Sequence, residues 1–342
     1  MKKTYHPFFR RLVCLGLPAA LSLSLLTGCQ TGTSGEKLTP VTLNEVAHSI
    51  FYAPQYAAIE LGYFKDEGID LTLVNGAGAD KVMTALISGD ADIGFMGSEA
   101  SIYTYAGGAE DYAVNFAQLT QRAGNFLVGR QPDSDFRWDK LRGTKVLGGR
   151  AGGMPQMVFE YILKKNGIDP KTDLTIDQSI NFGLTAAAFT SNDADYTVEF
   201  EPFATGLELE GNGYVVASLG TDSGYVPYTA YCARQSYMKS NPEIIQKFTN
   251  AIQRGMDYVN SHSAEEIAKT IQPQFKETPL ENITVIVERY KSQDTWKENL
   301  VFEKESFELL QNILEEAGEL PKRVPYEELV TTEFAKKAIP SS

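Results

Sequence analysis

The side chains that could do chemistry in this chain suit binding better than catalysis. Its three histidines, His6, His48 and His262, lie far apart, so the sequence holds no cluster with the spacing of metal ligands. It also contains no G-x-S-x-G elbow that would present a nucleophilic serine. We therefore expect no catalytic residue, no metal and no cofactor, and we interpret the chain as a non-enzyme.

An aromatic pair, Phe51 and Tyr52, offers a recognition surface instead. It follows Ser49 in a turn between an expected strand over residues 41–46 and an expected helix over residues 53–61. In an open α/β sheet, ligands bind at such turns, beyond the carboxyl ends of the strands. Either ring could stack on a planar ligand. We expect this turn to form one wall of a small-molecule cleft, with the inward-facing ring undecided between the two.

A second turn of the same kind contains Gly97, Ser98 and Glu99. It follows an expected strand over residues 92–96 and opens an expected helix over residues 100–106. A purely structural role is one interpretation: Ser98 caps that helix, and Glu99 interacts favourably with its dipole. The alternative, which we carry forward, is that all three residues contact a ligand.

A glycine-rich turn over residues 148–153 precedes a third helix. Glycine lets backbone N–H groups approach a ligand at a helix start, where the dipole favours anions. The segment matches neither the Walker loop nor G-x-G-x-x-G. We predict ligand contacts from Gly152, Gly153 and Met154, although a tight strand-to-helix turn would also explain the glycines.

Two carboxylates, Glu199 and Glu201, follow an expected strand over residues 195–198. Pro202 suits the first turn of a helix, so Glu201 would lie near the N-cap. We predict that Glu201 contacts amine or amidine groups of a ligand. The alternative is that the helix dipole stabilises its carboxylate and that it has no ligand role. Glu199 could face solvent.

The elements that position these residues alternate between strand-like and helix-like, which indicates an α/β fold. With 342 residues the chain exceeds the usual size of a single core. We predict two lobes, the first built from residues 41–130 and 226–342 and the second from residues 131–225, with a polar crossover over residues 131–142. Such an arrangement suits hinge closure around a ligand.

The amino-terminal segment combines basic residues with an apolar run over residues 12–26, which is too short for a comfortable membrane span. The run ends in Leu-Thr-Gly-Cys29, which resembles a bacterial lipobox. The resemblance implies a signal peptide over residues 1–28, lipidation of Cys29 and a flexible tether over residues 29–40. A plain signal peptide is the alternative. The formal net charge of −13 excludes nucleic acid as an expected partner.

Four segments in order, YAPQYAAIELGYFKDEGIDLTLV, ALISGDADIGFMG, KLRGTKVLGGRAGG and DADYTVEFEPFA, resemble the SsuA/THI5 (NMT1-like) solute-binding lipoproteins of ABC importers. The resemblance implies a type II periplasmic-binding-protein fold, with a mixed sheet flanked by helices in each lobe and the ligand between the lobes. It also implies ABC permease and ATPase subunits as partners, a monomer, and a lipid-anchored location on the outer face of the bacterial cell membrane.

Members of this family bind pyrimidine precursors of thiamine, sulfonates, taurine or nitrate. The anion-binding members commonly have Ser and Thr after glycine in the third turn, where this chain has Gly153 and Met154. Aromatic rings and carboxylates suit a flat, nitrogen-bearing ring better. We therefore predict a pyrimidine-like nutrient, with a sulfonate-, taurine- or nitrate-type anion as the alternative. The chain lacks the cysteine-rich motif of the eukaryotic THI5 enzymes, which disfavours catalysis on a small metabolite in the same cleft.

Overall fold

The computed structural model describes residues 37–149, 151–180, 183–320 and 322–339. From Lys37 onward the chain forms one compact unit. The expected signal peptide and the lipidation site at Cys29 lie outside the described residues. Within the described residues, no helix is long and apolar enough to cross a membrane.

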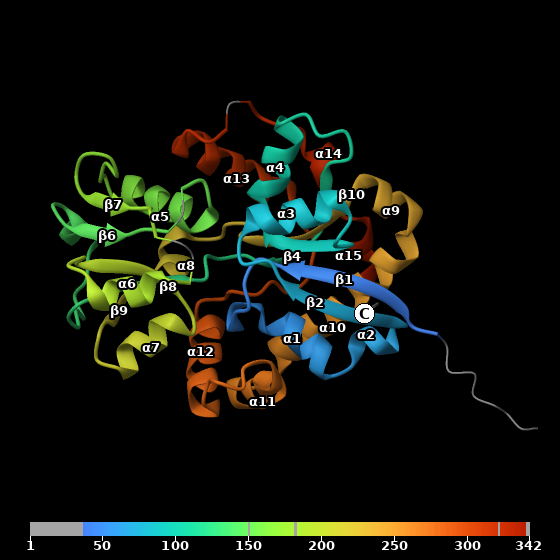
Figure 1. The fold of residues 1–342 in the computed structure, drawn as a ribbon, viewed down its shortest axis with the longest axis horizontal. Coiled ribbons are helices and arrows are strands. Elements are labelled where there is room, and N and C mark those ends of the chain that lie inside the picture. The colour runs from blue at the N-terminus through green and yellow to red at the C-terminus, as the bar shows by residue number, and fades with distance from the viewer. Residues whose placement is uncertain (1–36, 150, 181–182, 321, 340–342) are drawn as a thin grey trace, which may run out of the picture. The chain divides into compact units, whose positions relative to one another are not determined.

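Two mixed five-stranded sheets form the framework, as predicted (Figure 1). In the first sheet β1, β2 and β3 run parallel, and β10 runs antiparallel to β3 and β4. Its order is β2 (Ile69–Asn75), β1 (Thr39–Glu45), β3 (Ile93–Gly97), β10 (Thr229–Arg234) and β4 (Ala113–Thr120). The order of the second sheet is β7 (Thr175–Asp177), β6 (Lys145–Leu147), β8 (Tyr196–Phe200), β5 (Asn125–Gly129) and β9 (Tyr214–Ser218).

Helices flank both sheets. In Figure 1, α3 and α4 lie above the first sheet and α1, α2 and α10 below it. The helices that precede β10 in the chain are η1 (Ile50–Tyr52), α1 (Ala53–Glu60), α2 (Tyr63–Asp66), α3 (Ala79–Ser88), α4 (Glu99–Ala106), η2 (Trp138–Leu141), α5 (Met154–Lys165), α6 (Thr185–Ser191), α7 (Phe203–Leu209) and α8 (Leu219–Ser223). Those that follow it are α9 (Gln235–Ser240), α10 (Pro242–Ser261), α11 (Ala264–Ile271), η3 (Gln272–Gln274), α12 (Leu280–Ser292), α13 (Lys304–Ala317), α14 (Tyr326–Leu329) and α15 (Glu333–Ala338).

The chain passes from the first sheet to the second earlier than expected. Strand β4 ends at Thr120 in the first sheet, and β5 begins at Asn125 in the second. Residues 131–142, predicted to form the crossover, come after β5 in the chain and contain η2, so the chain has already entered the second sheet before them. The apolar run of β5 does not reveal its sheet, because its partners β8 and β9 begin only at Tyr196 and Tyr214. We therefore draw the lobe boundary along the two sheets.

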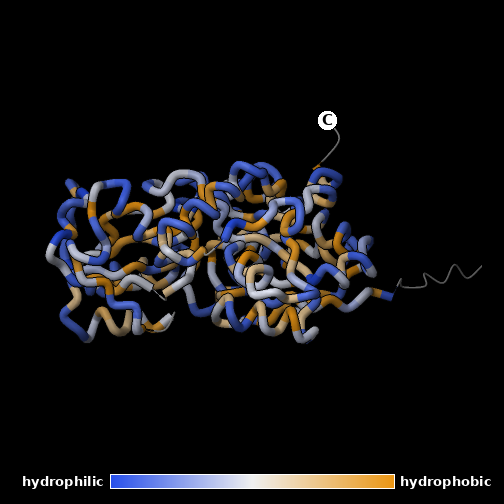
Figure 2. Tube along the Cα trace, turned by 90° about the horizontal axis from the view of Figure 1, so that it is seen from above, coloured by the Kyte–Doolittle hydropathy of each residue, from blue (hydrophilic) through white to orange (hydrophobic). Residues whose placement is uncertain are grey.

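The long helix α10 shows how an apolar face is buried against the first lobe. Its side chains Phe248, Ile252 and Met256 are fully buried, and their spacing places them on one face of the helix. A Cβ on Gly255 would lie 2.2 Å from the carbonyl oxygen of Pro54, so only glycine lets α10 pack this closely on α1. Figure 2 shows the apolar segments running through the middle of this unit, with hydrophilic segments mainly on the outer turns.

Candidate functional site

A cavity lies between the two sheets, at the ends of strands β1, β3 and β8. Its empty volume, which includes the open mouth, is about 650 Å³. Both lobes contribute to its wall, as the sequence predicted for a ligand cleft. The cavity is lined by Val46, Ala47, Ser49, Tyr52, Gly78, Ala79, Gly97, Glu99, Gly153, Met154, Pro155, Phe200, Tyr228 and Thr229.

Helix starts surround this cavity. Helices α3, α4 and α5 begin at Ala79, Glu99 and Met154, and all three residues line the wall. In none of the three does the side chain of the N-cap residue (Gly78, Ser98 or Gly153) form a capping hydrogen bond. Their first-turn N–H groups lack partners within the helix, and the helix dipoles add partial positive charge. The cavity therefore offers backbone donors to acceptor atoms of a ligand.

Glu99 adds a negative group to the same wall. The residue is 2 % exposed, and its carboxylate lies directly over Gly97. A Cβ on Gly97 would lie 2.1 Å from Oε2 of Glu99, so glycine at the end of β3 makes room for the carboxylate. Among the described lining residues none is a lysine, arginine or histidine.

Three aromatic rings, those of Tyr52, Phe200 and Tyr228, form the aromatic part of the wall. Burial raises the pKa of both tyrosines far above its ordinary value, so their hydroxyls stay neutral donors. The Tyr228 hydroxyl donates to Oδ1 of Asn125 at 2.8 Å. Phe51 lies behind this wall, fully buried, with its ring centroid 5.2 Å from that of Tyr52. Tyr52 is thus the inward-facing member of the pair.

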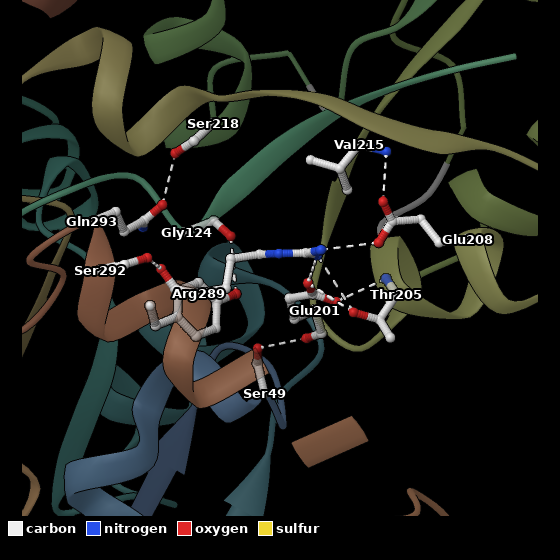
Figure 3. A network of polar contacts seen from close by, with 11 residues as sticks. Ser49, Gly124, Glu201, Thr205, Glu208, Val215, Ser218, Arg289, Ser292 and Gln293 are labelled. Carbon is white, nitrogen blue, oxygen red and sulfur yellow. Dashed lines mark hydrogen bonds and ion pairs between the residues drawn. The ribbon is translucent and has the colours of Figure 1, made fainter. Parts of the chain in front are cut away.

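Glu201 is held in a polar network beside the cavity (Figure 3). Its carboxylate forms an ion pair with Arg289 of α12 and accepts from the backbone N–H of Thr205 at 2.9 Å and its hydroxyl at 3.0 Å. Arg289 also contacts Glu208 at 2.9 Å. The backbone carbonyl of Glu201 accepts a hydrogen bond from the Ser49 hydroxyl at 2.9 Å. Glu201 therefore joins the lobes rather than lining the cavity.

Another buried carboxylate, Glu45, supports the turn that carries the cavity wall. Its oxygens contact His48 Nδ1 at 2.8 Å and accept from Gln55 at 2.7 Å and from the Tyr56 hydroxyl at 2.8 Å. The other ring nitrogen of His48 contacts the carbonyl oxygen of Gln274 at 2.9 Å. Because both ring nitrogens face acceptors, the protonated imidazolium satisfies both contacts. The Glu45 carboxylate accordingly raises the pKa of His48.

Six of the ten predicted ligand-binding residues line the cavity, and four do not. Those that line it are Ser49, Tyr52, Gly97, Glu99, Gly153 and Met154. Of the others, Phe51 is core and Glu201 is bound by Arg289. The Ser98 hydroxyl donates to the Pro227 carbonyl at 2.9 Å, and the Gly152 N–H donates to Gln156 at 2.8 Å. Within the described residues, no group of three His, Cys, Asp or Glu could hold a metal ion.

The cavity also contains residues that sequence reasoning missed. Gly78 and Ala79 open α3 after the glycine-rich end of β2, a signal of the same kind as the other two turns. Tyr228 and Thr229 lie where the chain returns to the first sheet, and no local pattern marks them. Phe200 lies between the two carboxylates that drew attention instead.

Comparison with known proteins places this architecture among the periplasmic-binding-protein folds. The alkanesulfonate-binding protein SsuA from Xanthomonas axonopodis pv. citri, solved with bound MOPS, superposes with a TM-score of 0.69 at 16% identity, covering 86% of this chain and 98% of that chain. At that identity the likeness concerns the fold alone.

The family follows from the sequence comparisons. The profile of the "NMT1/THI5 like" family matches residues 50–266, and the chain belongs to that family. It is 45% identical to the "Putative binding protein YtlA" of Bacillus subtilis (strain 168), over 96% of this chain and 98% of that protein. It is 24% identical to the 4-amino-5-hydroxymethyl-2-methylpyrimidine phosphate synthase of Candida albicans (strain WO-1), over 64% of this chain and 66% of that one.

Proposed function

We propose that this protein is the extracytoplasmic solute-binding component of an ABC importer and that it captures a small, pyrimidine-like nutrient between its lobes. The single observation that carries the proposal is the cavity itself, which draws its wall from both sheets. It combines neutral tyrosine rings, uncapped helix starts and the Glu99 carboxylate. The similarity to YtlA, which is named as a binding protein, supports the class.

The chemistry of the wall supports a nitrogen-bearing ring as the ligand. A planar heterocycle could contact the rings of Tyr52 and Tyr228, and its ring nitrogens could accept from the backbone N–H groups at the helix starts. An amino or amidine group could donate to Glu99, which gives a charge-assisted hydrogen bond. The Candida relative is named for a phosphorylated pyrimidine of this type, which agrees with the proposal.

An anion of the sulfonate, taurine or nitrate type is the second candidate. The helix starts at Ala79 and Met154 favour it, because helix dipoles attract negative charge. The alkanesulfonate-binding protein shares the fold. Against it stands Glu99, whose negative charge would repel a bound anion inside a largely buried cavity.

The two lobes are joined in this structure in a way that suits capture. The Ser49 hydroxyl reaches the Glu201 carbonyl, and the Tyr103 hydroxyl of α4 donates to the Gly152 carbonyl at 3.2 Å. A ligand that contacts both walls would favour this arrangement, and a permease could recognise it. We further propose that the protein acts as a monomer anchored through lipidated Cys29 and works with permease and ATPase subunits.

The substitution Glu99→Gln separates the two ligand classes by the sign of its effect. Melting temperatures and calorimetric titrations would be measured with 4-amino-5-hydroxymethyl-2-methylpyrimidine, thiamine, taurine, nitrate and an alkanesulfonate. The substitution should weaken the binding of a pyrimidine by about 1–3 kcal/mol, as for the loss of a hydrogen bond to a charged group, and should strengthen the binding of an anion. Glu210→Gln, at an exposed position beyond α7, is the matched control.

Two outcomes would contradict the proposal. If no compound raises the melting temperature, although saturation at one hundred times Kd should add about 2.7 kcal/mol, this ligand assignment fails. If mass spectrometry shows that the protein converts any bound compound into a product, the non-enzymatic role fails.

A further inference from the structure

A second cavity lies beside the first, on the side of the second sheet. We call it the Glu199 chamber. It has an empty volume of about 330 Å³ and shares two wall residues, Pro155 and Phe200, with the main cavity. The full lining is Asn125, Gly149, Pro155, Gly183, Thr185, Val198, Glu199, Phe200 and Phe203. Because the walls are shared, a ligand in the main cavity lies next to this chamber.

Glu199 brings a carboxyl group into the chamber, whereas the sequence alone suggested that it could face solvent. It is 2 % exposed and accepts hydrogen bonds from the hydroxyls of Thr185 at 3.0 Å and Thr197 at 2.6 Å. Among the described residues, no lysine or arginine is a cause of its pKa shift. Burial raises the pKa of Glu199 to about 7, against the opposing effect of the two hydroxyls. The group is therefore not permanently charged at neutral pH.

Asn125 supplies the complementary group. Its side chain is fully buried, and Oδ1 accepts from the Tyr228 hydroxyl, which itself lines the main cavity. Its Nδ2 atom has no hydrogen-bond partner among the described residues. A buried donor without a partner has lost its hydrogen bonds to water without replacement, so an acceptor atom supplied by a ligand would remove that penalty.

We propose that the Glu199 chamber is a subsite of the ligand site and receives a neutral, amide-like edge of the ligand. Such an edge carries an acceptor atom, which faces Nδ2 of Asn125, beside an N–H donor, which faces the Glu199 carboxyl. Carboxamides and 4-aminopyrimidines both present this pair of atoms. The inference rests on the proposed function and narrows the class of ligand to neutral compounds. The Glu199 carboxyl would disfavour an anion, and the Asn125 N–H donor would disfavour a permanent cation.

The test compares two small probes on the full chain by ligand-observed NMR titration. 4-Aminopyrimidine carries the complete donor–acceptor edge, and pyrimidine carries only the acceptor. We expect 4-aminopyrimidine to bind at least tenfold more tightly. Glu199→Met removes the acceptor that faces the amino group and should reduce that preference to less than threefold. Asn125→Asp removes the donor that faces the ring nitrogen of both probes and should weaken the binding of both at least fivefold. Asn44→Asp is the matched control, because Asn44 is a buried asparagine of β1 that lines neither cavity.

The possible results separate this inference from the proposed function. Equal affinities for the probes, a preference that survives the Glu199 substitution, unchanged affinities in the Asn125 variant, or no binding of 4-aminopyrimidine would each overturn the subsite. Those results would leave the proposed function standing if a compound of the larger panel still raises the melting temperature. If Asn125→Asp does not fold, Asn125→Ala removes the same donor and should weaken the binding of both probes alike.

Discussion

Removing Arg289 should expose how strongly the network around Glu201 holds the lobes together. The Glu201 side chain has no exposed surface, and that of Arg289 is 24% exposed. In an Arg289→Met variant the carboxylate would stay buried and keep only its two hydrogen bonds to Thr205. Breaking a buried ion pair by removing one partner costs about 3–5 kcal/mol. Because Arg289 is partly exposed, we expect the lower half of that range, about 3–4 kcal/mol.

The assay is urea unfolding of the wild type, Arg289→Met, Glu201→Gln and the double variant at pH 7. The double variant should recover much of the loss, because no unpaired charge then remains, with a coupling energy of at least about 1 kcal/mol. Arg254→Met is the matched control. Its partner Asp66 is 57% exposed, and such surface pairs contribute at most about 1 kcal/mol. A loss below about 1 kcal/mol in Arg289→Met, or additive losses in the double variant, would refute the reasoning.

Three further predictions concern stability. Because the pKa of His48 is raised in the folded state, protonation of this residue stabilises the fold, and the full contribution is present below the unfolded pKa of about 6.5. The contribution is lost as the pH rises through the higher folded pKa. The free energy of unfolding measured from pH 6 to 9 should show this decline, and the His48→Gln variant should lack it. Gly255→Ala should lower the free energy of unfolding by about 1–3 kcal/mol, because the new methyl group overpacks against α1. The control Gly206→Ala in α7, where the new Cβ would meet no neighbouring element within 4 Å, should not destabilise the protein. Thermal unfolding of both variants would measure this difference. Phe51→Ala should lose about 3–5 kcal/mol in urea unfolding, and a loss under 1 kcal/mol would contradict the core position of this ring.

The sequence by itself determined the local elements and the turns at which a ligand could bind. Local patterns located the strands and helices expected over residues 41–46, 53–61, 92–96, 100–106 and 195–198. Glycine and proline marked the turns around Ser49, Gly97 and Gly153, because backbone requirements at a helix start are local. The short helices α2, α8, α9 and α14 were missed, since a single helical turn has no periodicity to detect.

The tertiary structure alone decided which of those residues face the cavity. Phe51 and Tyr52 are adjacent and both aromatic, so only packing against the surrounding rings sends Tyr52 inward and Phe51 into the core. Glu201 is bound by Arg289, 88 positions away, and no local pattern reveals that partner. The same holds for Glu199, whose burial depends on Thr185, on Thr197 and on a chamber completed by Asn125 of β5. Side-chain direction and charge pairing are long-range properties, and the sequence contains them only through the fold.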